Sequence, residues 1–595
     1  MIRYKAPVED IRFVLYELLR YEERIAPLPG YGEATRDTVD AILEEAARFC
    51  ENELLPLNGP GDAEGCAFDQ GAVRTPPGFK EAYKTFAENG WTGLACDPGY
   101  GGQGLPHVVE FLLEEMICST NLSFGITPGL THAAYLALLH HGNEEQKRLF
   151  LPKLVAGTWT GTMCLTEPQC GTDLGLVTTR AEPQEDGTYL MTGSKIFISA
   201  GEHDLSENII HLVLARLPGA PSGTRGISLF LVPKVWVNAD GTLGPPNGVA
   251  CASIERKMGI HASPTCALNF EAARASLIGE PHRGMRAMFT MMNAARLKIG
   301  LQGLGLAETA YQSAVAYARE RLQGRSLTGA KYPDRAADPI IVHPDVRRNL
   351  LTMRAYNEGA RALALWVGMA MDIASRDTDP TRRAQADDLL SLMTPVVKAF
   401  FTDYGFEATN LGLQVFGGSG YIRDSGLEQL VRDARIAQIY EGTNGIQALD
   451  LVGRKMGQNG GKLLRRFFQP VSSFVEEASQ EPRMQEFVRP LAKALGRLQQ
   501  VTLRLAQESL KDRDVAGAAA SDYLRLFALV ALGYMWAQMA RAALLRPRGE
   551  NTAFYEAKLA TARFYFARLL PQTSSLTAAI LSGAAPIMDM HEDWF

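Results

Sequence analysis

Cysteine is scarce and unevenly distributed in this chain. Of 595 residues only eight are cysteines, at positions 50, 66, 96, 118, 164, 170, 251 and 266, and none follows residue 266. No two of them form a C-x-x-C pair, so neither a zinc site nor a disulfide scaffold is indicated. We therefore expect free thiols and a cytoplasmic location, where thiols stay reduced.

A strong excess of charge of either sign is also lacking. The chain has 60 Lys and Arg against 66 Asp and Glu, a formal net charge of −6. Such a balance gives no electrostatic footprint for nucleic acid or for an anionic membrane, and we expect no nucleic acid partner. Residues 461–595 carry 17 basic against 13 acidic residues, which is a small local excess of positive charge.

Long hydrophobic runs are absent as well. The N-terminal MIRYKAPVEDIRF has acidic residues and no apolar run, so a secretory signal is not expected. The uncharged stretch Leu526–Ala540 is shorter than the roughly 20 residues of a membrane-spanning helix. We predict a buried helix there and no membrane span. The length of the chain exceeds what one core supports, so several domains are expected.

Familiar catalytic motifs are missing or lack their structural context. There is no H-E-x-x-H and no convincing nucleophile elbow, so neither a metal site nor serine-hydrolase chemistry is predicted. GYGGQG at residues 99–104 formally satisfies G-x-G-x-x-G. A dinucleotide-binding turn requires a strand directly before it, and the preceding FAENGWTGLACDP is not strand-like, so a structural loop is favoured.

Helical periodicity flanks a central β region. Apolar residues recur at three- and four-residue intervals before residue 160 and again after Met285. Between them lie β-branched runs such as NIIHLVLARL and GISLFLVPKV, separated by turn formers, as in an antiparallel β domain. We predict a mainly α protein with a central β domain (α+β). Its four parts are an N-terminal helical domain (1–160), an antiparallel β domain (161–280), a helical bundle (281–458) and a C-terminal helical module (459–595).

Three stretches combine polar side chains with turn formers. CLTEPQCGTDL, Cys164–Leu174, offers hydroxyl and backbone N–H groups to a cofactor, although a plain β-turn cluster explains it equally. In SKIFISAG, Phe197 and Ser199 share one strand face, where they would cover a flat ring or fill the core. QVFGGSGY, Gln414–Tyr421, is typical of a helix end, and its glycines would also let a phosphate approach the backbone.

A single carboxylate stands out in RDARIAQIYEGTNGIQ. Glu441 follows the apolar Ile436, Ala437 and Ile439 and precedes a Gly-Thr-Asn-Gly turn. Partial desolvation among these groups would raise the pKa of Glu441 toward the range of a general base near pH 7. Taken alone, an exposed Glu or one near a helix start remains the simpler interpretation.

Together, these motifs resemble those of the acyl-CoA dehydrogenase flavoprotein family. TMCLTEPQCGTDL, GSKIFISAG, ARERLQGR, QVFGGSGY and RDARIAQIYEGTNGIQ follow one another at about the family's intervals, over roughly residues 1–455. The extra helices after residue 460 resemble the longer bacterial branch that contains 3-methylmercaptopropionyl-CoA dehydrogenases. The resemblance implies a helical domain, a β-barrel-like middle domain, a four-helix bundle, FAD as cofactor, and a homodimer or higher homo-oligomer.

The resemblance also implies the site residues. Glu441 matches the catalytic base. The implied FAD contacts are Met163, Leu165, Thr166, Thr172, Phe197, Ser199 and Thr443, with Arg321, Gln414, Gly417 and Gly418 reaching the FAD of a neighbouring subunit. The implied acyl-CoA contacts are Thr172, Asn293, Arg296 and Gly442. Phe124 and Pro128 lie on the stretch that lines the family's acyl pocket, where their bulk would favour a modest acyl chain.

The implied reaction is α,β-dehydrogenation of an acyl-CoA thioester to the trans-2-enoyl-CoA, with Glu441 taking the α proton and flavin N5 the β hydride. The acyl group would be short to medium or 3-methylmercaptopropionyl, and an electron-transfer flavoprotein would accept the electrons, within fatty acid metabolism. Two alternatives share these motifs: an acyl-CoA oxidase that uses oxygen, and a flavin-containing DNA-damage-associated binding protein. The small basic excess after residue 461 is weak support for the latter.

Overall fold

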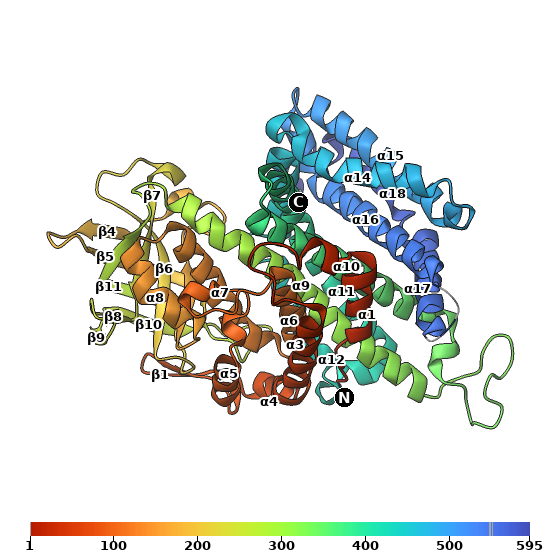
Figure 1. Cartoon of the computed structure of the whole chain (residues 1–595), viewed down its shortest axis with the longest axis horizontal. Helices are drawn as coiled ribbons and strands as arrows, with labels where there is room; N and C mark the ends of the chain where they lie inside the picture. The colour runs from red at the N-terminus through yellow and green to blue at the C-terminus, as the bar shows by residue number, and fades with distance from the viewer. Residues whose placement is uncertain (1, 547–548, 550) are drawn as a thin grey trace. The chain divides into compact units, whose positions relative to one another are not determined.

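The chain folds into two compact units, each built from separate stretches of sequence. The computed structural model describes residues 2–546, 549 and 551–595. One unit comprises Arg48–Leu105 and Thr120–Lys298, and the other comprises Met1–Ala47, Pro106–Ser119 and Ile299–Phe595. Figure 1 labels the elements of both. The order of helices, sheet and helices along the chain confirms the predicted α+β class.

The first unit holds all the strands together with several helices. Its helices are α4 (Leu55–Glu64), α5 (Phe79–Glu88), α7 (Leu122–His141), α8 (Glu144–Val155) and the first part of α9 (Gly284–Glu320). Its strands are β1 (Ala67–Asp69), β2 (Ala72–Arg74), β3 (Trp159–Cys164), β4 (Arg180–Pro183), β5 (Tyr189–Ser199), β6 (Asn208–Arg216), β7 (Ile227–Pro233), β8 (Val235–Val237), β9 (Leu243–Pro246), β10 (Val249–Ile254) and β11 (Thr265–Ile278).

Seven of these strands form one sheet that closes on itself. The order is β10-β11-β5-β4-β6-β3, and β7 pairs with both β11 and β6, so β11, β5, β4, β6 and β7 make a ring. The domain was predicted to be antiparallel, and most of its strand pairs are. The exceptions are β3 and β6, which pair in parallel, and β4 and β6, which do so at Arg180 and Arg216. The long connection between β3 and β6, which contains β4 and β5, makes the parallel pairing possible.

Both faces of this sheet are covered by apolar side chains. One buried cluster joins β6 and β7 to α7, α8 and the start of α9 through residues such as Leu212, Leu229 and Met288. A second fills the other side with Met191, Phe230 and Phe270 among others. The strands β6 and β7 are accordingly buried along almost their whole length, and they present a rigid support for the loops that follow β3 and β5.

The second unit is helical in its described residues. It contains α1 (Val8–Arg12), α2 (Tyr21–Arg24), most of α3 (Arg36–Phe49), most of α6 (His107–Thr120), the remainder of α9, α10 (Pro344–Arg376), α11 (Pro380–Phe416), α12 (Leu427–Arg435), α13 (Asn444–Asp450), α14 (Lys462–Ala478), α15 (Gln485–Glu508), α16 (Arg513–Leu545), α17 (Thr552–Phe564), α18 (Gln572–Leu581) and α19 (Ala585–Met588).

Helix α16 is the centre of the C-terminal part. It packs against α10, α11 and α13 of the bundle and against α15, α17 and α18. The indole N–H of Trp536 donates to the carbonyl of Ala355 in α10 at 2.8 Å. The predicted burial of Leu526–Ala540 is confirmed, since nearly all of this stretch lies inside the protein. The residues after 460 therefore share one core with the bundle.

Two described helices, α7 and α16, are long and apolar enough by length and composition to cross a membrane. In α7, 83% of the most apolar window is buried inside the protein, and in α16 the share is 67%. Such burial is typical of core helices.

A cluster of buried charges ties distant segments of the helical unit together. The Arg361 guanidinium on α10 contacts Glu115 of α6 at 2.7 Å and Glu308 of α9 at 2.9 Å, and it also pairs with Asp10. Lys558 of α17, which is fully buried, pairs with the same Asp10. Removing one of these side chains would leave its partners as unpaired buried charges. The cluster therefore stabilises the arrangement of α1, α6, α9, α10 and α17.

Candidate active site

The loop predicted to face the flavin leaves the end of β3. Met163, Leu165 and Thr166 are half-buried, and the Thr166 carbonyl accepts a hydrogen bond from the Ile196 N–H of β5 at 2.9 Å. The Lys195 ammonium, which is fully buried, donates to the Leu165 carbonyl at 2.9 Å. β3, the loop and β5 are thus joined at the point where the implied flavin contacts occur.

The buried carboxylate of Glu167 holds the same loop through several hydrogen bonds. Glu167 accepts 2.8 Å hydrogen bonds from the Lys195 ammonium and the Thr178 N–H, and a 3.1 Å bond from the Thr179 N–H. The hydroxyls of both threonines also donate to it. Burial by itself raises the pKa of Glu167, but Lys195 and the other donors outweigh it and lower this pKa to about 2. Glu167 is therefore ionised at neutral pH.

Phe197 lies at a β-bulge near the end of β5. Between the pairs Lys195↔Leu268 and Ile198↔Cys266, β5 has one residue more than β11. Phe197 absorbs it with a φ of 58°, in the left-handed region, and its side chain is 59% exposed. Ser199 is half-buried, and the intervening Ile198 points into the core. An aromatic ring held in a strained conformation and left exposed is suited to cover a planar ligand.

Three more residues of this unit were predicted to contact FAD or acyl-CoA, and they lie on one turn and one helix. Thr172 is exposed in the turn after Glu167. Asn293 and Arg296 are one turn apart on α9, and an Arg296 N–H donates to the Asn293 side-chain oxygen at 3.2 Å. Arg296 is buried, whereas Asn293 is exposed. The structure brings these two residues together.

Phe124, one of two residues from which a limit on acyl length was expected, lies in a cluster of aromatic rings. Its buried ring packs against Phe79, Tyr83 and Phe86, with ring centroids 5.6 to 6.5 Å apart. These contacts occupy the ring with internal packing of α7 on α5. The limit on acyl length expected from Phe124 and Pro128 stays a prediction.

In the helical unit, the predicted base lies in a short loop between α12 and α13. Glu441 has a φ of 57° and Gly442 a φ of 84°, so two successive residues are left-handed. A glutamate in this region is uncommon and strained, and such strain concentrates at functional sites. Glu441 is half-buried. The backbone therefore fixes the direction in which its carboxylate leaves the loop.

Buried side chains of α11 hold this loop in place. The Lys398 ammonium donates to the Gly442 carbonyl at 2.9 Å and to the Asn444 side-chain oxygen at 2.8 Å. The Asn444 amide donates in turn to the Ala399 carbonyl at 3.1 Å. Gln447 adds a donor to the Gly442 carbonyl at 3.1 Å. Every one of these bonds restrains the backbone on the C-terminal side of Glu441.

The neighbours of the base are fixed as well. Tyr440 donates its hydroxyl to the Gln302 side-chain oxygen of α9, and burial raises the pKa of Tyr440 well above its ordinary value. Thr443 caps α13 by accepting from the Ile446 N–H at 3.4 Å. Tyr440 is thus neutral and anchors the start of the loop.

The predicted residues for a neighbouring subunit's FAD gather at the ends of α9 and α11. Arg321 is exposed just after α9. One turn earlier Tyr317 stacks on Phe416, with ring centroids 4.1 Å apart, directly before Gly417 and Gly418. The Gln414 carbonyl accepts the Gly417 N–H that closes α11. A Cβ added at either glycine would meet open space, so a ligand can approach their backbone from that side.

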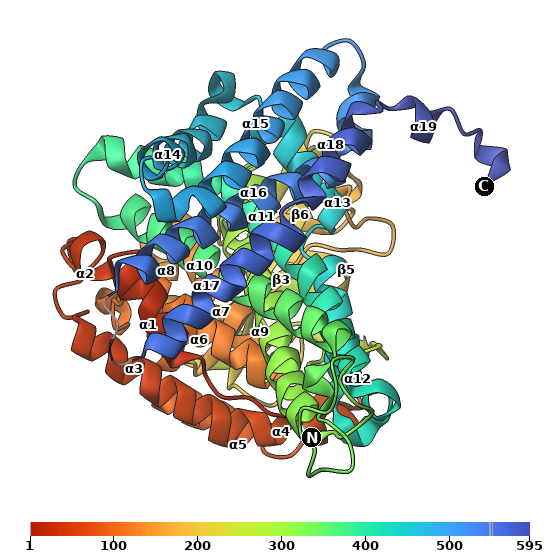
Figure 2. The same cartoon turned by 90° about the vertical axis from the view of Figure 1, so that its right-hand side faces the viewer.

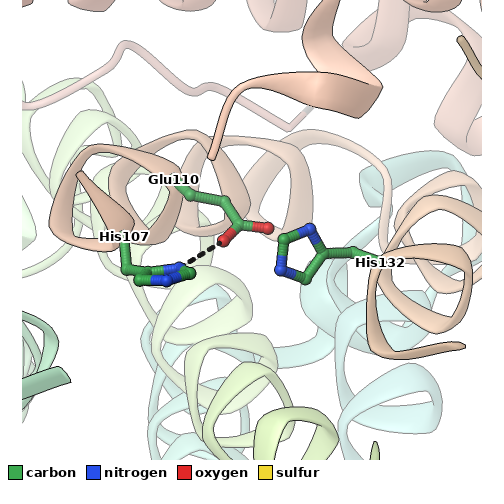
Figure 3. A group of neighbouring side chains, drawn as sticks. All are labelled: His107, Glu110 and His132. Carbon is green, nitrogen blue, oxygen red and sulfur yellow. Dashed lines mark ion pairs between the residues drawn. The ribbon is translucent and has the colours of Figure 1, made fainter. Parts of the chain in front are cut away.

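One further ionisable pair lies outside these groups. His107 and Glu110, at the start of α6, form an ion pair with 3.5 Å between the imidazole Nδ1 and the carboxylate (Figure 3). His132, drawn in the same view, belongs to α7 of the other unit, where its Nδ1 is 3.8 Å from the Cys96 sulfur.

Sequence reasoning missed the buried lysines that position the two loops. Lys195 lies in SKIFIS and Lys398 in TPVVKAFF, each within an apolar stretch. Lysine is almost never fully buried unless it is paired. A lysine flanked on both sides by core residues could therefore have indicated a buried, paired lysine. Its partners could not have been identified, because they are distant in sequence.

Family models match nearly the whole chain. The acyl-CoA dehydrogenase N-terminal domain matches residues 36–158, the middle domain 162–273 and the C-terminal domain 282–456. A model described as acetyl-CoA dehydrogenase C-terminal like matches residues 467–591.

Individual relatives match over their full length. The 3-methylmercaptopropionyl-CoA dehydrogenase of Ruegeria pomeroyi is 42% identical over 96% of this chain and 97% of its own. The broad-specificity linear acyl-CoA dehydrogenase FadE5 of Mycobacterium tuberculosis is 34% identical over 100% of both chains. An acyl-CoA dehydrogenase from Bacillus anthracis, solved with FAD, has the same fold, with a TM-score of 0.73 and 22% identity over 96% of this chain and 91% of that one.

Proposed function

Because this chain belongs to the acyl-CoA dehydrogenase family, we propose that Glu441 is the base of an FAD-dependent α,β-dehydrogenation. The enzyme is an oxidoreductase that converts an acyl-CoA thioester to the enoyl-CoA. The observation that carries the assignment of the base is the Glu441 loop itself. It presents a carboxylate from two consecutive left-handed residues on a backbone pinned by a buried lysine.

FAD is the cofactor, and the residues present fit it. The exposed ring of Phe197 offers an aromatic surface to a flat ring system. The open backbone at Gly417 and Gly418 is suited to a phosphate group. We assign FAD contacts to Met163, Leu165, Thr166, Thr172, Phe197, Ser199 and Thr443, and assign Arg321, Gln414, Gly417 and Gly418 to the FAD of a second subunit. When bound, FAD supplies the acceptor for the hydride that leaves the substrate β carbon.

The chain's own residues perform the proton chemistry. The Glu441 carboxylate takes the proton from the α carbon as the hydride leaves the β carbon, so that the C–C bond becomes a double bond and both hydrogens are accounted for. To the Glu441 N–H we assign the polarisation of the thioester carbonyl, which would stabilise negative charge that develops on its oxygen. Gly442 leaves room for the ligand beside the base. Asn293 and Arg296 contact the CoA portion.

For the substrate we propose 3-methylmercaptopropionyl-CoA or a short to medium straight-chain acyl-CoA. The relatives support both: the Ruegeria pomeroyi enzyme is named for the thioether substrate and FadE5 for linear acyl-CoAs.

We also propose the location, the oligomeric state and the electron acceptor of the protein. The protein acts in the cytoplasm in fatty acid metabolism, as a homodimer or higher homo-oligomer, and passes its electrons to an electron-transfer flavoprotein. Residues from two subunits are needed if Arg321 and Gly417 meet a neighbour's FAD, which is why assembly belongs to the proposal. Acyl-CoA oxidase activity is the competing proposal for the same base.

Anaerobic mixing of the FAD-loaded enzyme with saturated acyl-CoAs tests this assignment. We expect the flavin absorbance of the wild type to bleach, and Glu441→Gln to bind FAD equally but to bleach at least about 10³-fold more slowly, because it lacks the base. Glu428→Gln, in the preceding helix α12, serves as the control. Equal bleaching by Glu441→Gln would assign the base elsewhere.

The same assay separates the substrates and acceptors. The initial panel contains butyryl-CoA, octanoyl-CoA, palmitoyl-CoA and 3-methylmercaptopropionyl-CoA, and the fastest bleaching identifies the acyl class. Rapid oxygen consumption during turnover without an added acceptor would favour the oxidase. Duplex DNA shifted in a salt-sensitive manner would instead favour the DNA-associated branch.

A further inference from the structure

Residues 585–595, which we call the C-terminal tail, carry apolar and acidic side chains together. The tail begins with α19 and exposes Ile587, Met588, Met590, Trp594 and Phe595. The Trp594 side chain is 72% exposed. Asp589, Glu592 and Asp593 are its acidic residues, and the tail contains no Lys or Arg. An exposed segment of this composition is suited to bind an apolar groove with basic edges.

Among the described residues, the hydrogen bonds, ion pair and ring contact of the tail are local. Its hydrogen bonds join residues 584–595 to one another, His591 pairs with Asp593, and the His591 ring contacts the Trp594 ring. Figure 2 shows α19 and the C-terminus projecting away from α15 and α18. The apolar side chains of the tail are thus left in water, which is unfavourable for so many of them in one segment.

A groove with the complementary character lies where the tail departs. Gln500, Leu503, Arg504 and Gln507 of α15 line it together with Leu581 at the end of α18, and its volume is about 360 Å³. Leu503 is 61% exposed. Four basic residues lie between residues 489 and 507 of this helix: Arg489, Lys493, Arg497 and Arg504. Arg504 pairs with Glu508 of the same helix at 2.6 Å, so the positive charge beside the groove comes mainly from Arg489, Lys493 and Arg497. The groove thus offers apolar contact next to the basic turns of α15.

We propose that the tail of a second copy of this chain docks in this groove. Its apolar side chains would cover Leu503 and Leu581, and its carboxylates would face the basic side chains of α15. A chain's own tail begins four residues after Leu581, which lines that chain's own groove, and runs away from it, whereas the tail of a second copy can approach from outside. Two copies that exchange tails form a closed, symmetric pair. The proposal is independent of the assignment of Glu441.

Site-specific cross-linking of the FAD-loaded enzyme tests the exchange. One copy, carrying an affinity tag, has Gln507→Cys, and an untagged copy has Trp594→Cys; the two are mixed and mildly oxidised. All native cysteines precede residue 267, so the wild type gives the background. We expect a disulfide between the tagged and untagged chains. Leu503→Glu in the tagged copy should lower its yield about tenfold, because it would bury a carboxylate against the acidic tail.

A matched leucine variant serves as the control for Leu503→Glu, and three outcomes would contradict the exchange of tails. Leu510→Glu alters another exposed leucine that does not line the groove and should leave the yield unchanged. A chain with both cysteines that links only to itself would show that the tail folds back on its own groove. No link, although both cysteines react with a maleimide, would also overturn the proposal, as would equal effects of Leu503→Glu and Leu510→Glu.

Discussion

At the scale of single residues, the ion pair of Lys195 and Glu167 determines the shape of the loop after β3. The Lys195 ammonium is 2.8 Å from the Glu167 carboxylate and also binds the Leu165 carbonyl. Both side chains are buried, so neither charge can be solvated if its partner is lost. The pair therefore links the stability of the β domain to the position of residues assigned to FAD.

Replacing Lys195 by Met should weaken both folding and FAD binding. Removing one partner of a buried pair costs roughly 3–5 kcal/mol, and the loss of the donor to Leu165 frees the loop. We expect a lower denaturation midpoint and an FAD dissociation constant raised about tenfold or more, measured by fluorescence titration. Arg274→Met breaks an exposed pair with Asp186 in the same unit and should change neither quantity measurably.

The double variant Lys195→Met with Glu167→Gln separates the two effects. With both charges removed, part of the lost stability should return, since no unpaired ion remains buried. If the single and double variants unfold at the same denaturant concentration, the pair does not stabilise the β domain in this way.

Two buried histidines make the β domain sensitive to acid. Burial lowers the pKa of His203 and of His211 to about 3, and their ring nitrogens contact Thr160 at 3.0 Å and Thr162 at 2.7 Å. In the unfolded chain a histidine binds a proton near pH 6.5, whereas in the folded state it does so only near pH 3. The unfolded state binds more protons between these values, so stability falls as the pH falls from 6.5.

His203→Gln should flatten that dependence. Between pH 6.5 and 5 we expect each buried histidine to contribute on the order of 1 kcal/mol of lost stability per pH unit, measured from urea unfolding monitored by fluorescence. His591→Gln, in the exposed tail, is the control. An unaltered slope in His203→Gln would mean that other groups set the acid sensitivity.

The sequence indicated which residues have a special role better than it indicated their backbone conformations. The motif around Glu441 indicated a carboxylate with a special role, but its left-handed φ depends on contacts with Lys398 and Gln447 that no local pattern specifies. From its spacing, Phe197 was placed on the same strand face as Ser199, where it would cover a flat ring or fill the core. The bulge that exposes it arises from pairing with β11, about 70 residues further along the chain.

At the scale of elements, α11 acts as the support of the catalytic loop. From its buried face Lys398 reaches Gly442 and Asn444, while Asp403 one turn later accepts from the Gln438 and Asn444 amides at 2.7 Å. The loop is thus bound to the helix on both sides of Glu441. A rigid helix beneath a short loop is the arrangement that keeps a catalytic group precisely placed.

Lys398→Met should impair turnover more than it impairs folding. Methionine has nearly the same length but cannot donate to the Gly442 carbonyl, so the Glu441 backbone gains freedom. We expect the rate of flavin bleaching at saturating acyl-CoA to fall about tenfold or more, since small displacements of a base are costly. FAD content should be retained. Lys462→Met, which removes one of the two cations that pair with Asp388 and leaves Arg466 in place, is the control.

Parallel losses in the Lys398 and Lys462 variants would contradict a positioning role for Lys398. So would a bleaching rate in Lys398→Met that is restored merely by lowering the temperature, because that result would indicate global instability. A role in positioning requires a rate that stays low where the variant is fully folded.

At this scale the sequence was informative for long elements and poor for short ones. The amphipathic periods of the bundle and the β-branched runs of β6 and β7 were recognisable because each repeats over many residues. The hairpin of β1 and β2, with only three residues per strand, was missed within a region predicted to be helical. The parallel partner of β3 could not be inferred, because pairing direction depends on the path of the intervening chain.

At the scale of the whole molecule, the buried charges around Arg361 and Lys558 make the helical unit a single cooperative structure. Asp10 contacts both cations, and although burial alone would raise the pKa of Asp10, Lys558 and Arg361 hold it below its ordinary value. Sequence patterns did not reveal this cluster. Its members lie as far as 548 residues apart, and each one alone resembles an ordinary surface charge.

Lys558→Met should therefore destabilise the entire helical unit. The substitution leaves Glu358 with Arg354 and leaves Asp10 with Arg361, but it removes one positive charge from a buried set, at a cost of roughly 3–5 kcal/mol. Arg563→Met, on the same helix α17, breaks an exposed pair with Glu486 and should cost about 1 kcal/mol or less. Urea unfolding of both variants measures the difference.

The two variants also decide whether the C-terminal module is part of the bundle fold or an attachment to it. If Lys558 unites them, Lys558→Met lowers the midpoint of one common transition, because α16 shares its core with α10 and α11. If the module unfolds by itself, the loss of Lys558 instead splits the curve, with an early transition that leaves FAD bound. A lowered single transition that releases FAD in step with helix loss is the expected result, and an early separate transition would contradict it.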